Sequence, residues 1–239
     1  MNTINNNINT KTFNRDIRTD KIANADKLKK LETLASETQD IGLLQKKNRV
    51  GQIYDKICSV INLNQQLKPK LEFLSKGMNI AAFANTTAKI YIDDSILKLI
   101  DYEDAVFIIR HELEHVKQFH NIMRMLGIKD FSKLITKNGA SADELGIEGI
   151  DIVNVKYYQK VEQILGKIDK NSREGFITQK YIDAFNQYPD LMGLMNRKDI
   201  GWIKKHILFI KEYLLHYRFN LLEREANKAA AKFVKTFKL

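Results

Sequence analysis

Residues 102–125 read YEDAVFIIRHELEHVKQFHNIMRM. This stretch predicts one long helix, because apolar residues recur at the i, i+3, i+7, i+10 spacing of a buried stripe. The members of that stripe are Val106, Ile109, Leu113 and Val116. The same stretch carries two histidines four residues apart and a glutamate directly after the first. We therefore expect this helix to lie in the core and to present polar groups for chemistry on a neighbouring face.

The two histidines, His111 and His115, lie one helical turn apart and project from the same face. Two imidazoles so placed reach one ion, and Zn²⁺ readily takes nitrogen ligands. Glu112 directly follows the first histidine, so its carboxylate projects beside a metal held there. That is the position of a general base for a metal-activated water. The alternative is an ordinary charged helix that carries two surface histidines.

A catalytic zinc site usually has three protein ligands and one open position. His120 follows His115 by five residues, which rotates it roughly 140° around the helix. We therefore expect His120 to pack in the core or to be solvated, and we look elsewhere for the third ligand.

The better candidate lies near the C-terminus, in the stretch LLEREANKAAAKFV at residues 221–234. Glu223 can donate a carboxylate oxygen to the metal. Asn227, one turn further on, can hydrogen-bond a ligating histidine and fix its ring orientation. The alanines of this stretch would let its helix approach the motif helix closely. The alternative is a plain amphipathic helix whose glutamates are solvated.

HELEHVKQ, together with LEREANKAA, resembles the gluzincin branch of zinc metallopeptidases, in which a glutamate on a later helix completes an HExxH site. The resemblance implies that His111, His115 and Glu223 bind one Zn²⁺ per chain and that Glu112 is the base. Asn227 stands where the family often has aspartate. More narrowly, HELxHVxQ plus ExEAxxxA resembles the metallopeptidase domains of bacterial contractile injection systems and toxins.

Peptide hydrolysis also needs a group that stabilises the tetrahedral oxyanion. Related families often place a tyrosine just before the glutamate ligand, which makes Tyr217 our choice and His216 its rival. On an uninterrupted helix His216 aligns better with Glu223, whereas a break near Asn220 would favour Tyr217.

The stretch AKIYID, directly before the motif helix, alternates apolar and polar residues and predicts a strand. The preceding NIAAFA is a second possible strand, with residues 85–87 as the turn between them. An edge strand can hold an extended peptide by its backbone, so Lys89, Ile90, Tyr91 and Ile92 are expected to bind substrate. Alternatively the strand only covers the core.

The rest of the chain predicts mainly helices, because 239 residues contain only 2 prolines and 11 glycines. We expect helices over residues 21–45, 50–63, 71–75 and 102–125, and a last one from about residue 203 to 234. Residues 1–20 are polar and are expected to be disordered. Residues 21–239 are expected to form a single zincin-like domain of mainly α (α+β) class. It would carry a small β-hairpin or sheet before the motif helix and a helical insertion at about 129–202.

Composition limits the cellular location and the partners that we expect for the protein. The single cysteine, Cys58, rules out an internal disulfide. The polar N-terminus predicts no signal peptide, and no apolar stretch approaches the roughly 20 residues of a membrane span. We therefore expect a protein that is cytoplasmic or is secreted as a bacterial effector. The net charge of +10 is spread over the chain without an aromatic-basic cluster, so no nucleic-acid partner is expected.

These observations favour a zinc-dependent endopeptidase, a bacterial effector or toxin that cleaves a protein or peptide substrate. The alternative is a catalytically silent adaptor with a zincin fold that binds an acidic protein partner. The intact glutamate of the motif argues against that alternative, because a structural zinc needs no base. A basic nucleic-acid-binding protein, in which HELEH is accidental, ranks last.

Overall fold

The computed structural model describes residues 42–77, 80–137, 153–187 and 220–237, together with residues 201, 204, 207, 208 and 211. The described elements are α2 (Leu43–Val60), η2 (Gln65–Leu67), β1 (Lys70–Leu74), β2 (Ala81–Ala84), β3 (Lys89–Asp93), α3 (Asp94–Leu99), α4 (Tyr102–Leu126), α5 (Ile128–Lys137), α6 (Val155–Leu165), α7 (Arg173–Asn186) and α10 (Leu221–Phe237). The described chain is mainly helical with a small sheet before α4, so the predicted α+β class is confirmed.

Helix α4 matches the predicted motif helix almost residue for residue. It begins with a capping box, in which the Asp101 side chain accepts from the Asp104 backbone N–H and the Asp104 side chain accepts from Asp101. It ends at Gly127, whose φ of +74° favours glycine. Both ends of α4 are therefore encoded locally.

The sheet has the strand order β1-β3-β2. Strands β2 and β3 form the predicted antiparallel hairpin, with Phe83 opposite Ile90. β1 pairs in parallel with the other side of β3, with Leu71 opposite Ile90. The central strand is thus β3, and β2 forms one edge.

The helix predicted over residues 71–75 is wrong, because this stretch is strand β1. Leu71 and Phe73 alternate toward the main core, and Glu72 between them faces the other way and pairs with Lys89 at 2.9 Å. This period-two pattern is too short to be decisive alone. The pairing partner, β3, lies about twenty residues further along the chain.

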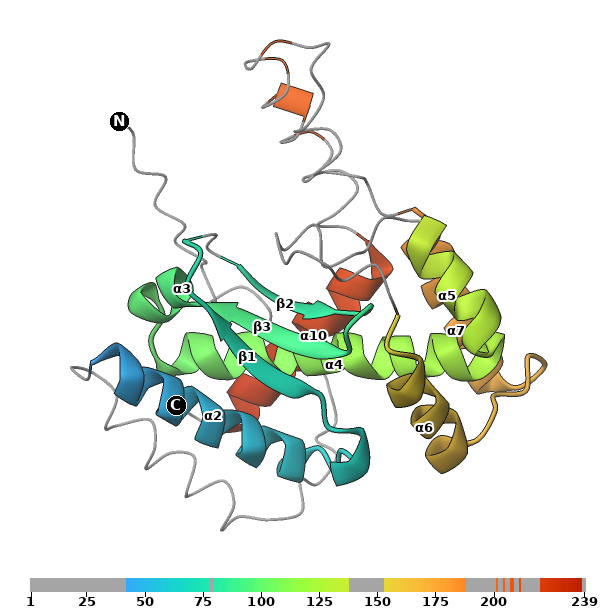
Figure 1. The fold of residues 1–239 in the computed structure, drawn as a ribbon, viewed down its shortest axis with the longest axis horizontal. Coiled ribbons are helices and arrows are strands. Elements are labelled where there is room, and N and C mark those ends of the chain that lie inside the picture. The colour runs from blue at the N-terminus through green and yellow to red at the C-terminus, as the bar shows by residue number, and fades with distance from the viewer. Residues whose placement is uncertain are drawn as a thin grey trace.

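Two clusters of buried residues lie along α4. The first half of α4 packs with α2 and β3, through residues such as Val106, Ile57 and Ile92. The second half packs with α5, α6 and α7. Figure 1 shows the sheet over the middle of α4, α10 crossing behind it, and α5, α6 and α7 gathered at its C-terminal end. α4 is the axis on which the described elements assemble.

The last predicted helix is interrupted, because α10 begins at Leu221 and Asn220 is not helical. The Asn220 side chain accepts a hydrogen bond from the Leu222 backbone N–H at 2.9 Å and donates one to the Ala184 carbonyl at 2.8 Å. Asparagine competes well for such end positions, which explains the break. The start of α10 is thereby fixed to the end of α7.

Several predictions concern residues that the structure does not describe. The tail at 1–20 and residues 21–41 of the helix predicted at 21–45 lie outside the described residues. Residues 43–45 begin α2, which continues to Val60, so the break predicted between residues 45 and 50 is wrong. The described parts of the predicted insertion at 129–202 contain α5, α6 and α7. The single domain over 21–239 stays a prediction. Among the described helices, none combines the length and apolar character needed to cross a bilayer.

The contact between α4 and α10 is the most extensive of any described pair of elements. Ala226 and Ala230, one turn apart on α10, are completely buried. Small side chains at these positions let two helix backbones approach closely, as the alanine run predicts. Ala231 lies on the exposed side of the same helix.

We expect Ala226→Leu to destabilise the protein by about 1–3 kcal/mol, because the added atoms have no space between α4 and α10. Urea unfolding measures the free energy. Ala231→Leu is the matched control on the exposed face, and it should change that free energy by less than about 0.5 kcal/mol. Equal effects of the two substitutions would contradict the close packing.

Candidate metal centre

His111 and His115 project from one face of α4, as their spacing predicts. Their Nε2 atoms lie 3.0 Å apart, and the ring planes meet nearly edge to face, with centroids 4.7 Å apart. Both rings are largely enclosed. Two nitrogen donors thus face a common point.

Glu223, in the first turn of α10, completes this cluster. Its Oε2 lies 3.3 Å from His111 Nε2, and its Oε1 lies 3.3 Å from His115 Nε2. The donor atoms of the three residues all lie within 4.8 Å of one another. More than a hundred residues separate Glu223 from the histidines, and the packing of α10 on α4 brings them together.

The electrostatics of the cluster depend on the Glu223 carboxylate. Burial alone would raise the pKa of Glu223, but hydrogen bonds from both histidines hold it well below its usual range. Burial would likewise lower the pKa of His115, but the adjacent Glu223 carboxylate outweighs burial and raises it to about 9. The metal-free cluster therefore holds a proton that a bound cation would replace.

The donor set fits a divalent transition metal. Two imidazole nitrogens and one carboxylate are the ligands of the His₂Glu class of catalytic zinc sites. A cation at the common point of the three side chains would displace the proton from His115. Its attraction to the Glu223 carboxylate would replace the attraction of that proton. Among the described residues this is the one group of three or more His, Cys, Asp and Glu side chains that is arranged to hold an ion.

Glu112 lies beside the cluster and faces a different element. Its Oε2 accepts a hydrogen bond from the backbone N–H of Phe83 on β2 at 2.6 Å. Its other oxygen, Oε1, lies 3.9 Å from His111 Nε2. Burial raises the pKa of Glu112, against the opposing influence of both histidines and of the Phe83 amide. A carboxylate whose pKa is raised is a stronger proton acceptor than an exposed one.

Gln118 is a residue of the site that sequence analysis missed. It is only 1% exposed, and its Oε1 lies 2.8 Å from His115 Nδ1. Its Nε2 donates to the Leu222 carbonyl on α10 at 3.1 Å, which fixes the orientation of the amide. His115 Nδ1 must therefore donate its proton to Gln118, and Nε2 is left to face the cluster. The i, i+3 spacing from His115 was the available signal.

Asn227, which we expected to orient a histidine, lies on the exposed side of α10. The described partner of His115 Nδ1 is Gln118 instead. His111 Nδ1 is buried, and among the described residues it has no hydrogen-bond partner. Among the described side chains, one therefore orients the ring of His115, and none orients the ring of His111 through Nδ1.

The substrate-binding prediction for β3 rested on its being an edge strand, and that premise is wrong. β3 is paired on both sides, and Ile90, Tyr91 and Ile92 are buried. Lys89 forms an ion pair with Glu72. The backbone of β3 cannot pair with a further strand, because β1 and β2 already occupy both of its edges. The strand that borders Glu112 is β2.

His120 takes no part in the cluster, as its rotation around the helix predicts. It is buried, and its Nε2 lies 2.7 Å from the Tyr157 hydroxyl, which donates to the Leu67 carbonyl. Burial lowers the pKa of His120 to about 3, so it is neutral. The two candidates for the oxyanion role, His216 and Tyr217, lie outside the described residues.

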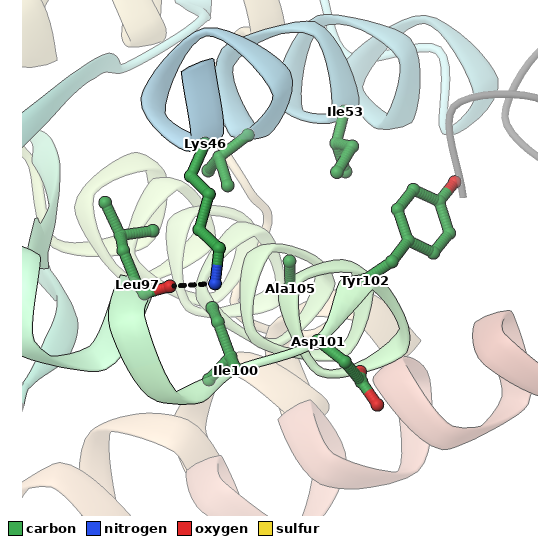
Figure 2. A pocket seen from close by; sticks show the side chains of 8 residues that line it. Lys46, Ile53, Leu97, Ile100, Asp101, Tyr102 and Ala105 are labelled. Atoms are coloured by element: carbon green, nitrogen blue, oxygen red, sulfur yellow. Dashed lines mark hydrogen bonds between the residues drawn. The ribbon is translucent and has the colours of Figure 1, made fainter. Parts of the chain in front are cut away.

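A small hollow lies elsewhere, between α2, α3 and the start of α4 (Figure 2). Its lining is mostly apolar, with residues such as Val50, Ile53 and Ala105. Figure 2 shows the one lysine that lines it, Lys46, whose Nζ donates to the Leu97 carbonyl at 3.2 Å. This lysine is already bonded and serves to connect α2 with α3. None of the groups in the His–His–Glu cluster lines the hollow.

Comparison with known proteins adds one finding. The model of peptidase family M48 matches residues 44–166, just over half of the chain. The matched segment includes α2, the sheet, all of α4 and α6, but not Glu223. Searches of curated proteins and of solved structures gave no match.

We expect Gln118→Met to weaken zinc binding about 10- to 100-fold, because His115 loses the partner that fixes its ring. Competition with a chromophoric chelator measures the dissociation constant. Gln179→Met is the matched control, since Gln179 is exposed on α7 and its amide donates to Asp183 at 2.9 Å, far from the cluster in sequence. An unchanged zinc affinity in Gln118→Met would contradict this role.

The metal-free protein should become less stable as pH rises from about 6.5 to 9. The folded pKa of His115, about 9, lies above its ordinary value of 6.5. The contribution of the His115–Glu223 pair is therefore complete below pH 6.5 and is lost as pH rises through 9. Urea unfolding in the presence of a chelator tests this. Glu223→Gln should remove the loss, because burial then dominates the His115 pKa.

Proposed function

The chain belongs to peptidase family M48, and from this premise we propose that this metallopeptidase is a zinc-dependent endopeptidase that cleaves a protein substrate. The observation that carries the proposal is the convergence of His111, His115 and Glu223 within 4.8 Å, with Glu112 beside them. A purely structural metal site needs no such carboxylate.

The three converging side chains would hold the ion through the two Nε2 atoms and the Glu223 carboxylate. Zinc bound there supplies a Lewis acid that polarises a carbonyl and makes water acidic near neutral pH. The remaining chemistry falls to side chains of this chain. Gln118 keeps His115 in the tautomer whose Nε2 is free to ligate.

Glu112 is the proposed general base. Its Oε1 faces the histidine pair, whereas its Oε2 is held by β2. From this position it would take a proton from the attacking water and deliver that proton to the amine that leaves. Its raised pKa suits the first half of the transfer, because it makes the carboxylate a stronger proton acceptor.

The outer edge of β2 is the proposed binding site for the substrate backbone. The Ile80 carbonyl accepts a hydrogen bond from the Asp93 N–H on β3. The backbone N–H and C=O groups of residues 80, 82 and 84 therefore point toward β3, and those of Ala81 and Phe83 point away from it. Within the described chain no strand pairs with that edge. An extended peptide added there would use backbone hydrogen bonds and would pass beside Glu112.

Tyr217 remains our proposal for the group that stabilises the oxyanion, with His216 as its rival. The argument is the helix break at Asn220, because a chain that turns before α10 no longer keeps the straight-helix alignment of His216 with Glu223.

The proposal extends to a role as a bacterial effector or toxin. Its support is the resemblance of HELEHVKQ and of the ExEAxxxA stretch at residues 223–230 to metallopeptidase domains of contractile injection systems and toxins. Such an enzyme would act on one protein in a target cell. The competing function, a silent adaptor for an acidic partner, predicts binding that does not depend on Glu112.

We expect Glu112→Gln to lower cleavage by at least about 10²-fold and to leave the zinc content unchanged, because Glu112 is the base and not one of the three donors. Mass-spectrometric mapping of new N-termini in a treated proteome measures cleavage, and elemental analysis measures zinc. Glu114→Gln is the matched control. Glu114 lies two residues on and pairs with Arg110 at 2.7 Å, so cleavage should persist.

Two outcomes would contradict the proposal. A wild-type protein that binds one zinc but cleaves nothing favours the adaptor. A wild-type protein that binds no zinc, and whose stability ignores chelators, removes the metal centre itself.

A further inference from the structure

We propose that strand β2 positions the general base, through the hydrogen bond from the Phe83 backbone N–H to Glu112. This inference rests on the proposed function and names a second task for the strand assigned to the substrate. The Phe83 N–H is a positioning group here, because it acts on the substrate only through Glu112. Its contribution comes from the backbone and is invisible in the side-chain motif.

The direction of the Phe83 amide favours this role. Strand β2 pairs with β3 through its even-numbered residues, as the bond from Asp93 N to the Ile80 carbonyl at 2.9 Å indicates. The N–H of Phe83 therefore points away from the sheet. It would be left without a partner at an edge strand, and Glu112 Oε2 accepts it at 2.6 Å.

The two oxygens of Glu112 have different neighbours. Oε2 is held by the strand, and Oε1 lies on the side of His111. Glu112 is 6% exposed, so water does little to orient it. A hydrogen bond to one oxygen of a buried carboxylate fixes the rotamer and aims the other oxygen. Proton transfer depends strongly on such aim.

Strand β2 is also fixed to α4 at a second point. The Phe83 ring packs against Phe119, with centroids 5.9 Å apart and an interplanar angle of 51°. Phe119 lies seven residues after Glu112, on the same face of α4. Backbone and side chain of one residue thus hold the strand in register with the motif helix. A peptide docked on β2 would be placed relative to the base by the same contacts.

The decisive experiment replaces the Phe83 amide by an ester. Phe83→phenyllactic acid, introduced by nonsense suppression, removes the N–H and keeps the ring on Phe119. We expect kcat to fall about 10- to 100-fold, the range for a hydrogen bond to a charged group. KM and zinc content should stay within about twofold, because neither the outward carbonyls of Ala81 and Phe83 nor the metal donors change.

Ala81→lactic acid is the matched control. It also removes an outward N–H of β2 and weakens the preceding ladder carbonyl, but no contact to Glu112 is lost. We expect this ester to alter KM rather than kcat. Equal losses of kcat in both esters would show that only the strand is weakened and would overturn the proposal, as would an unchanged kcat in the Phe83 ester.

A second measurement does not depend on cleavage. The Phe83 amide should exchange its hydrogen slowly in the wild type and in Glu112→Gln, which keeps an acceptor, and at least about 10-fold faster in Glu112→Ala. The Ala81 amide, on the same edge, should exchange alike in all three proteins. Fast exchange of Phe83 in the wild type would overturn the positioning role. If the wild type binds zinc and protects Phe83 but cleaves nothing, the proposed function fails and the contact stands.

Discussion

The structure depends on the buried meeting of one carboxylate with two imidazoles where α10 crosses α4. Glu223 cannot be buried as an isolated charge without a large loss of hydration, so its position is tolerable only opposite a positive partner. In the metal-free molecule the proton on His115 is that partner, and a bound cation would replace it. The completely buried alanines of α10 allow the backbones to come close enough for this contact.

Helical geometry explains how α4 serves several neighbours at once. Each residue turns the helix by about 100°, so Glu112 faces a different direction from His111 although it follows it directly. His111 and His115 therefore face α10, Glu112 faces β2, and His120 faces Tyr157 on α6. Residues close together on α4 thus contact three different elements.

The supporting contacts follow the same distribution. Gln118 connects the ring of His115 with the backbone of α10, and Phe83 connects the carboxylate of Glu112 with the sheet. Asn220 fixes the first turn of α10 to the end of α7. The family match ends at residue 166, before this region, so the third donor comes from chain that the matched segment does not include. The centre is complete only when these distant segments pack.

Local sequence determined the motif helix, because its apolar stripe, its capping residues and its terminal glycine all act within a few residues of one another. It also determined the β2–β3 hairpin, and it identified the His–Glu–His spacing and Glu223 as a distant donor. Tertiary structure decided which strand forms the edge. β1 pairs in parallel with β3, and local sequence does not specify this pairing because β2 lies between the two strands in the chain. It also decided that Gln118, rather than Asn227, supports His115, since this depends on how α10 is rotated against α4. Periodicity specifies which face of an element is apolar, whereas the position of that face relative to another element is fixed only by packing.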